Sequence, residues 1–579
     1  MSNIFNKYEL KIKNIIVELL GADVDLSRVT CEPPRDMTHG DMATNAAMVL
    51  SKAAGMKPRD LAEKLAEKLR SMQGIKEVEI AGPGFINFRL TAEEWGELLK
   101  EILSLGIHYG DGHPASKRKV NIEYVSANPT GPMTVGHVRG AVVGDVLASV
   151  MKKAGYDVTR EYYFNDAGTQ VDVLSRTCYL RYREALGEKI GEIPAGLYPG
   201  EYMKEVAQSL VERDGNKWLD KDESEWLAPI RDFAVKYLME VIKEDLRLIG
   251  IKHDVFTNER EIVENTLEEA FNILDKKGLI YTGVLPPPKG KEIEDWEPVP
   301  LTLFRSSDFG DSTDRPLKKR DGTWAYIMPD IAYHYDKTRR GFDWMINVLG
   351  KDHGGYLERM RPAIAAFSDN KAQIDVIFNA MVKVLKNGVP VKLSKRSGNI
   401  ITLRETVEEV GAAAVRFFML SRSADSEMEF DFAKAVEQSK DNPVFYVQYA
   451  HARCHSILRK SLEIFNKEEI SLENLLKADL SMVTSEDELE IIRVMSNWPR
   501  FVEAAAEARE PHRIVFYLQE LAAAFHSFWN KGKDDARLRF LIENNRELSL
   551  ARLALVQAVA TVIASGLNVM GVTPLEEMH

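Results

Sequence analysis

Cysteine is scarce in this sequence. The 579 residues include three, Cys31, Cys178 and Cys454, which lie far apart in the chain. Without paired cysteines at short spacing, neither a disulfide framework nor a cysteine-based zinc site is expected, and the scarcity fits a reducing cytoplasm. No second histidine or cysteine stands at ligand spacing from His353, so we predict no protein-held metal.

Long apolar runs are also lacking. The start of the chain has no charged-then-apolar leader, and we find no uninterrupted apolar stretch long enough to cross a bilayer. This predicts a cytoplasmic protein with no membrane partner. An apolar fraction of 45% and a charged fraction of 28% are typical of globular proteins, and the length suggests about three to four domains. The net charge is −12, whereas proteins that bind nucleic acid over their whole surface are basic. If RNA is a partner, its phosphates would have to contact a local basic surface.

The most informative stretch is residues 121–144. Alternating apolar residues around Ile122 predict a strand, Pro129 and Gly131 interrupt it, and apolar residues then recur at helical spacing as far as Val150. Neither a Walker loop nor the Rossmann dinucleotide spacing is present. The sequence therefore predicts a strand, a tight loop and a helix of some other kind.

The start of that helix could bind a phosphate-sized anion. Free N–H groups and the positive end of the helix dipole converge there, Gly136 leaves room, and His137 and Arg139 would add donors. Taken alone, a Gly-His pair at a helix start is more often an ordinary cap.

The order of the elements predicts an α/β fold. A second strand over residues 158–164 completes a βαβ unit, which indicates a doubly wound parallel sheet with ligands at the carboxyl ends of its strands. Residues 175–285 are helical by pattern and are interpreted as an insertion. The sheet is then expected to resume at residues 301–304, 324–327 and 345–349.

The two ends of the chain differ from this core. Residues 1–115 predict a small α+β module in which amphipathic helices precede two strands joined at residues 81–84. From residue 436 to residue 579 the pattern is helical, and its aromatic side chains are explained as bundle core or, for a few exposed ones, as stacking surfaces for bases.

A basic loop follows a predicted hairpin at residues 382–391, whose turn is Asn387-Gly388 and whose Pro390 restricts the second strand to a sheet edge. In that loop Lys392 and Lys395 stand three residues apart, so both could reach the oxygens of one triphosphate. The alternative is a solvated basic turn.

Two of these segments resemble the signatures of class I aminoacyl-tRNA synthetases, in the bacterial arginyl-tRNA synthetase form. Residues 126–141, Ser-Ala-Asn-Pro-Thr-Gly-Pro-Met-Thr-Val-Gly-His-Val-Arg-Gly-Ala, are similar to the first signature, except that Thr134 stands where the family has its first histidine. Lys-Leu-Ser-Lys at residues 392–395 is similar to the second, with Leu393 in place of methionine. The N-terminal Thr-His-Gly-Asp segment at residues 38–41 and residues 442–453 also resemble the family.

The resemblance implies roles for individual residues. For Glu123 and Asp330 these roles differ from what periodicity alone predicts. Periodicity would make Glu123 a polar residue on a strand face and Asp330 a helix N-cap. The implied catalytic residues are His137, Lys392 and Lys395. The implied ATP-binding residues are Thr134, Gly136, His137, His353, Lys392, Ser394 and Lys395. The implied arginine-binding residues are Glu123, Asn128, Tyr326 and Asp330, and the implied tRNA-binding residues are Tyr446, Tyr449 and Arg453.

The resemblance also implies the reaction and the domains. An arginine–tRNA ligase would use ATP, with Mg²⁺, to form arginyl-adenylate and would transfer arginine to the terminal ribose of tRNA(Arg). We expect a monomer with an N-terminal domain on the tRNA elbow (1–115), a Rossmann-like catalytic domain (116–435) and an α-helical anticodon-binding domain (436–579). Two alternatives stay open: another class I synthetase, and a tRNA-binding paralogue whose catalysis is impaired by Thr134.

Overall fold

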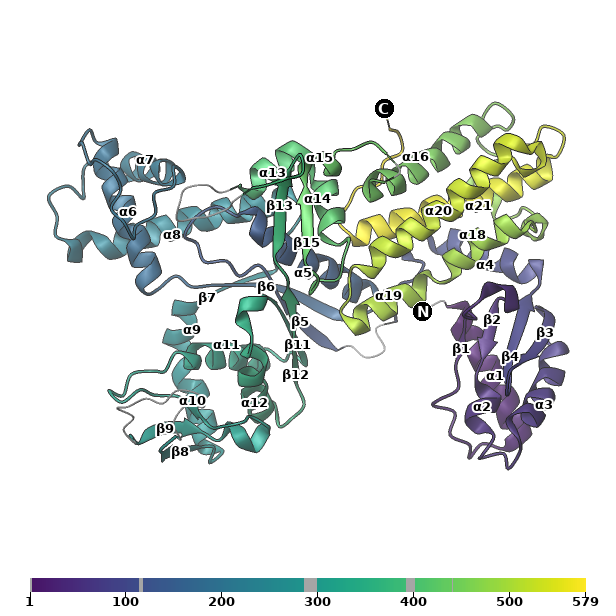
Figure 1. The fold of residues 1–579 in the computed structure, drawn as a ribbon, viewed down its shortest axis with the longest axis horizontal. Helices are drawn as coiled ribbons and strands as arrows, with labels where there is room; N and C mark the ends of the chain where they lie inside the picture. Colours follow the sequence, from purple (N-terminus) through teal and green to yellow (C-terminus); the bar gives the residue numbers. More distant parts are fainter. Residues whose placement is uncertain (1–2, 114–117, 286–298, 392–400, 440, 579) are drawn as a thin grey trace. The chain divides into compact units, whose positions relative to one another are not determined.

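A computed structural model of the chain describes residues 3–113, 118–285, 299–391, 401–439 and 441–578 (Figure 1). It divides into two compact units. Residues 114–437 and 509–512 form the central unit, and residues 1–113, 438–508 and 513–579 form the terminal unit. The expected N-terminal and C-terminal domains therefore belong to one unit.

The central unit contains the expected parallel sheet. Its five strands are β5 (Lys119–Glu123), β6 (Asp157–Phe164), β7 (Val255–Asn258), β11 (Trp344–Gly350) and β12 (Gln373–Asn379). Their order is β12-β11-β5-β6-β7, and every neighbouring pair is parallel. From β5 the chain moves outward in one direction through β6 and β7, and later in the other direction from β11 to β12. The boundary between β5 and β11 is the point at which a doubly wound sheet binds its ligands.

Helix α5 (Val135–Lys153) packs closely on this sheet. It is buried on most of its surface because it contacts strands β5, β6 and β11 on one side and β13 and α14 on the other. A Cβ atom at Gly144 would lie 2.3 Å from Cβ of Tyr124, so only glycine lets the helix approach the end of β5 this closely. This contact fixes the start of α5 relative to the sheet.

The helical insertion is shorter than predicted. Helices α6 (Thr169–Ala185), α7 (Tyr202–Asp214) and α8 (Glu223–Leu248) form it, but β7 then returns to the sheet inside the range assigned to the insertion. The four residues of β7 are too few to show a strand period among helical patterns. Helices α9 (Glu259–Asn265) and α10 (Leu267–Lys276) follow β7.

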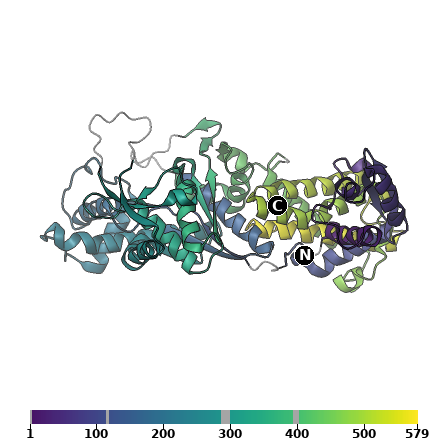
Figure 2. The same cartoon turned by 90° about the horizontal axis from the view of Figure 1, so that it is seen from below.

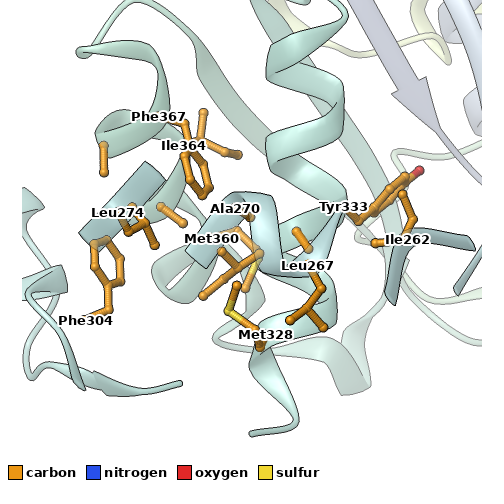
Figure 3. Packing of buried hydrophobic residues seen from close by; sticks show 14 of the residues in the cluster. Ile262, Leu267, Ala270, Leu274, Phe304, Met328, Tyr333, Met360, Ile364 and Phe367 are labelled. Carbon is orange, nitrogen blue, oxygen red and sulfur yellow. The ribbon is translucent and has the colours of Figure 1, made fainter. Parts of the chain in front are cut away.

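Two strands predicted for the parallel sheet are not part of it. Strand β9 (Leu301–Phe304) pairs antiparallel with β8 (Ile280–Gly283) and β10 (Arg315–Pro316) in a separate sheet. Residues 324–327 form no strand, because helix α11 (Ile327–Arg339) begins within them. Helices α10, α11 and α12 (Tyr356–Ser368) share a core with Phe304 of β9, so the apolar residues of these segments face that cluster (Figure 3).

The expected hairpin is part of a second small sheet in the central unit. Strands β13 (Val382–Lys386) and β14 (Val389–Pro390) are antiparallel, their turn places Asn387 and Gly388 at positive φ, and β14 is the edge strand. Strand β15 (Met428–Asp431) pairs with β13. Helices α13 (Leu403–Val410), α14 (Ala412–Met419) and α15 (Phe432–Ala435) complete the central unit.

The N-terminal part of the terminal unit is the predicted α+β module. Its sheet has the order β1-β2-β4-β3 and is antiparallel throughout, formed by β1 (Cys31–Glu32), β2 (Met42–Thr44), β3 (Ile75–Ala81) and β4 (Phe85–Leu90). Its helices are α1 (Ile4–Leu20), α2 (Ala46–Leu50), α3 (Pro58–Arg70) and α4 (Ala92–Leu105).

The C-terminal part is a helix bundle, as predicted. It consists of α16 (Pro443–Ser461), α17 (Leu472–Leu475), α18 (Glu486–Ser496), α19 (Trp498–Ala508), α20 (Arg513–Asp534) and α21 (Arg546–Val569). Figures 1 and 2 show α16, α20 and α21, in green to yellow, alongside one another, and these helices are in mutual contact.

Helix α21 corrects the expectation that no stretch is long and apolar enough to span a bilayer. Its most apolar window has a mean hydropathy of 1.7, which passes that test by length and composition. However, 78% of the window is buried inside the protein. A helix surrounded by neighbours, here α4, α16, α18 and α20, is apolar on every side because every side faces core.

A buried ion pair connects the N-terminal module to the bundle. Arg493 Nε of α18 donates to Asp41 Oδ1 at 2.8 Å, and the side chains are 5% and 2% exposed. Asp41 Oδ2 accepts from the backbone N–H of Leu90 on β4 at 2.7 Å. Nearby, the indole of Trp498 donates to the carbonyl of Tyr109. The module and the bundle therefore share buried polar contacts as well as apolar ones.

We predict that Arg493→Met destabilises the terminal unit by about 3–5 kcal/mol, because it leaves the Asp41 carboxylate buried without its cation. The measurement is the midpoint of urea unfolding followed by tryptophan fluorescence. Replacing both partners, with Asp41→Asn and Arg493→Met, should recover much of the loss. Arg537→Met is the matched control because that arginine is 89% exposed in its ion pair. A loss as large in the control as in Arg493→Met would contradict this account.

Candidate active site

The loop after β5 is held in a strained conformation at the boundary with β11. Val125 and Ser126 have φ values of 69° and 42°, in the region that non-glycine residues rarely adopt. The Ser126 hydroxyl donates to Glu123 Oε1 at 3.1 Å and accepts from the N–H of Tyr163 at 3.1 Å. Such strain persists where surrounding bonds impose it, commonly at ligand sites.

The start of α5 presents an open surface. Gly136 is exposed, and among the described residues a Cβ atom there would meet only the Thr134 hydroxyl, at 3.6 Å. The Thr134 N–H donates to His137 Nδ1 at 3.2 Å, and the Thr134 hydroxyl oxygen lies 3.0 Å from the same nitrogen. Because a backbone N–H can only donate, Nδ1 is an acceptor, and the neutral ring carries its proton on Nε2. The ring of His137 is thus oriented by the residue at the helix N-cap.

The chain that follows the second signature is attached to this helix start. The N–H of Val135 donates to the carbonyl of Ile401 at 3.1 Å, and the N–H of Leu403 donates to the carbonyl of Met133 at 2.9 Å. Residues 133–135 and 401–403 therefore lie side by side. Lys392, Ser394 and Lys395 themselves lie outside the described residues.

Arg139 has a different role from the one expected. It is 1% exposed, and its guanidinium donates to the carbonyls of Ala380, Ser423 and Ser426 at 3.2, 2.8 and 2.6 Å. Its position on α5 directs it into the protein, so it secures two neighbouring loops and is not a phosphate donor.

Glu123, at the end of β5, is buried and paired. Lys337 Nζ of α11 donates to its Oε2 at 2.7 Å, with side-chain exposures of 0% for the lysine and 6% for the glutamate. The neighbouring Glu161 has its own partners, accepting from Asn121, Thr257 and Arg340. Two buried carboxylates at adjacent strands are therefore each matched to a separate cation.

Asp330 is a third acid in this region. It lies in the first turn of α11, since the helix begins at Ile327, so it is not the N-cap. Burial raises the pKa of its carboxyl to about 7, and the nearby charges of Glu123 and Glu259 add to the effect. Among the described residues, no lysine or arginine lies within ion-pair distance of Asp330. Among the described residues, Asp330 is therefore a carboxylate without a protein counter-ion.

Glu259 is a site residue that the sequence analysis missed. It opens α9 directly after β7, and its Oε2 accepts from the Tyr163 hydroxyl at 3.1 Å. Burial raises the pKa of its carboxyl. The ring of Tyr163 stacks on Tyr333 of α11 at 4.3 Å between centroids. Recognition of β7 as a sheet strand would have placed Glu259 at the carboxyl edge with the other acids.

Three other sequence-predicted residues have different surroundings. Asn128 bridges two loops, since its Nδ2 donates to Gln170 Oε1 at 3.2 Å and its Oδ1 accepts from the N–H of Asn165 at 3.2 Å. Tyr326, one turn before Asp330, is 93% exposed. His353 follows the carboxyl end of β11, and its side chain is 54% exposed. The structure brings Glu123 and Asp330 together and leaves the Tyr326 ring in solvent.

In the terminal unit, α16 presents Tyr446, Tyr449 and Arg453 along one side. The Arg453 guanidinium lies 4.3 Å from the ring centroid of Tyr449 and 4.8 Å from that of Trp529 on α20. Tyr449 is 38% exposed. His526 packs against both tyrosines, at 4.7 Å from Tyr446. This is a surface cluster of aromatic rings with a cation between them.

Family comparisons cover nearly the whole chain. The arginyl tRNA synthetase N terminal domain matches residues 6–90, the catalytic domain of class I (R) tRNA synthetases matches residues 99–439, and the DALR anticodon binding domain matches residues 447–578. The catalytic match alone spans more than half of the chain. The chain belongs to the class I arginyl-tRNA synthetase family.

Relatives of this synthetase agree over their full lengths. The arginine–tRNA ligase of Parvibaculum lavamentivorans is 54% identical, with 100% of both chains covered. The arginine–tRNA ligase of Xanthobacter autotrophicus is also 54% identical, over 97% of this chain and 96% of the relative. The solved structure of the Thermus thermophilus arginyl-tRNA synthetase, 22% identical and covering 100% of each chain, has the same fold with a TM-score of 0.72.

We predict that Gly136→Ala raises the KM of this synthetase for ATP at least about tenfold, because the new methyl group occupies the open surface at the start of α5. Folding should not suffer, since alanine is the better helix former by about 0.5–1 kcal/mol and meets no close neighbour. Initial-rate kinetics and thermal unfolding are measured together. Gly140→Ala, one turn further into α5, is the control. An unchanged KM for ATP would refute phosphate binding at Gly136.

Proposed function

We propose that the central unit activates arginine at the boundary between β5 and β11 and then transfers it to tRNA(Arg). In the first step the arginine carboxylate attacks the α-phosphorus of ATP, giving arginyl-adenylate and pyrophosphate. In the second step a hydroxyl of the terminal ribose attacks the arginyl carbonyl and AMP leaves. Neither step needs a side-chain nucleophile, so the site works by alignment and by charge stabilisation.

The nucleotide end of the site is the start of α5. Thr134, Gly136 and His137 would contact the phosphates there, with His137 donating from Nε2 because Nδ1 is engaged by Thr134. Lys392, Ser394 and Lys395 would bind the triphosphate as pyrophosphate leaves. Support for this arrangement comes from the attachment of residues 401–403 beside Thr134. His353, after β11, is proposed to lie near the adenosine.

Mg²⁺ is proposed as the accompanying cation. It is a hard ion that prefers oxygen ligands, and in nucleotide enzymes it is held largely by phosphate oxygens. The N–H groups at the start of α5 and the proposed lysines would contact other phosphate oxygens, so the two sets of ligands are compatible. When bound, the ion would neutralise charge that develops on the leaving pyrophosphate.

The amino-acid end, the proposed arginine pocket, is the group formed by Glu123, which is buried, and by Asp330 and Glu259, which are partly exposed. This group of acids carries the proposal. A guanidinium presents five donors in a plane, which suits carboxylates set among aromatic rings. Asp330 lies in such a pocket without a protein counter-ion among the described residues. We assign it to the guanidinium, together with Tyr326 and the newly found Glu259. Glu123 and Asn128 are assigned to the α-amino and carboxylate groups.

The α16 cluster is proposed to bind tRNA. Tyr446 and Tyr449 offer ring faces for unstacked bases, and Arg453 offers a cation to a neighbouring phosphate. These residues lie within the part of the chain that matches the anticodon binding domain, apart from Tyr446, which stands one residue before it. We further propose that the protein acts as a monomer in the cytoplasm.

The test of the function is arginine-dependent exchange of pyrophosphate into ATP. The full chain is assayed with and without tRNA(Arg), with lysine and cysteine as control amino acids. We expect exchange with arginine alone among the three, and a dependence on tRNA. Exchange with another amino acid would make the chain a different class I synthetase. No exchange under any condition, with tRNA still bound, would make it an inactive paralogue.

We also predict that the KM for arginine rises as the pH falls below about 7. The Asp330 carboxyl has a raised pKa of about 7, and a protonated acid cannot pair with a guanidinium. The rise should approach about tenfold per pH unit below that value and vanish above it. The KM for ATP, measured in the same series, serves as the control. In Asp330→Asn the KM for arginine should be high and independent of pH across this range, whereas a pH-independent KM in the unaltered enzyme would contradict the assignment.

A further inference from the structure

Lys337 is a buried lysine inside the arginine pocket. Its side chain is 0% exposed, and Nζ lies 2.7 Å from Glu123 Oε2 and 4.2 Å from the ring centroid of Tyr333. Burial of an ammonium is costly unless a carboxylate compensates it, so the lysine and the glutamate depend on one another. Both residues sit where the sheet meets α11, one at a strand end and one near the helix end.

The surroundings of Lys337 link it to every other acid of the pocket. Lys337 stands seven residues after Asp330 on α11, which places the two on one side of the helix. The ring under its ammonium, Tyr333, stacks on Tyr163, whose hydroxyl donates to Glu259. Lys337 therefore contacts Glu123 directly, and the stacked rings of Tyr333 and Tyr163 lie between Lys337 and Glu259.

Other cations near the pocket are occupied or more distant. Arg340 donates to both oxygens of Glu161 at 2.8 Å and also pairs with Asp336 at 2.8 Å. Arg359 influences Asp330 but forms no ion pair with it among the described residues. Within the described part of the pocket, Lys337 is the cation that directly neutralises one of the three acids.

We propose that Lys337 is a positioning residue that fixes Glu123 and adjusts the charge of the pocket to that of arginine. The inference rests on the proposed function of the pocket. When Glu123, Asp330 and Glu259 are all ionised, the three acids and the ammonium of Lys337 leave two negative charges. Arginine brings two cationic groups to these acids, its α-ammonium and its guanidinium, while its own carboxylate is directed to the α-phosphorus of ATP, so the two cations can pair with the two remaining acids. Without Lys337, the third negative charge would have no counter-ion in the complex.

The expected consequence of Lys337→Met is a change in how arginine binding depends on pH. Without Lys337, Glu123 is left buried without its cation, and Asp330 loses one of the charges that lower its pKa. At neutral pH we expect the KM for arginine to rise at least about thirtyfold, and to fall again as the pH is raised toward 9. The KM for ATP should change less than about threefold, because the nucleotide end of the site is untouched.

Arg340→Met is the matched control. It breaks the partly buried ion pair between Glu161 and Arg340, which stands three residues after Lys337, and should destabilise the central unit without moving the pH profile for arginine. Both variants are compared with the unaltered full chain by steady-state aminoacylation between about pH 6 and about pH 9, after thermal unfolding has confirmed that each is folded.

A double variant keeps the proposal testable if Lys337→Met alone does not fold. In the presence of Glu123→Gln the lysine has no carboxylate to position, so adding Lys337→Met should change the KM for arginine no further. Additive effects of the two substitutions would overturn the proposal, as would a Lys337→Met profile that superimposes on that of the unaltered enzyme. In either case arginine-dependent exchange by the unaltered enzyme would leave the proposed function standing. Its absence there would instead refute the function itself.

Discussion

Parallel pairing of β5 with both β6 and β11 is the constraint on which the rest of the central unit depends. Because parallel strands end at one edge, the pairing gathers the loops after β5, β6, β7 and β11, which are far apart in the sequence. It also requires the close packing of Gly144 on Tyr124, which sets the start of α5 beside the strand ends. The topology of the sheet therefore brings the start of α5, the proposed phosphate site, to the same edge as the acidic residues.

The acids at this edge illustrate how a binding site retains unfavourable charge. Glu161 and Glu123 have protein cations, whereas Asp330 has none within ion-pair distance among the described residues. A partly buried carboxylate without a counter-ion costs stability, and this cost raises the pKa of Asp330 to about 7, so that below that pH the carboxyl holds a proton. A guanidinium can then exchange with that proton. A carboxylate in this setting that bound no ligand would only lower the stability of the fold.

Sequence reasoning captured the elements with strong periodicity and missed those defined by tertiary contact. The strand–loop–helix unit of β5 and α5, the Asn387-Gly388 hairpin and the terminal bundle follow from local patterns. Strand β7, with four residues, and the antiparallel partner of β9 do not, because pairing rather than pattern decides them. Because the sequence pattern does not identify β7 as a strand, it also does not place Glu259 at the carboxyl edge of the sheet. Arg139 was misread because its position beside His137 gave no sign that its side chain turns inward to three carbonyls.

The Thr134 replacement can be judged from the geometry of α5. A family histidine at this position could add a cation, which threonine cannot do. Threonine is, however, a good N-cap residue, and here its N–H and hydroxyl both lie against His137 Nδ1. This fixes the ring and keeps its proton on Nε2. The imidazole of His137 is thus oriented by Thr134 itself, so the replacement is compatible with the phosphate site proposed at the helix start.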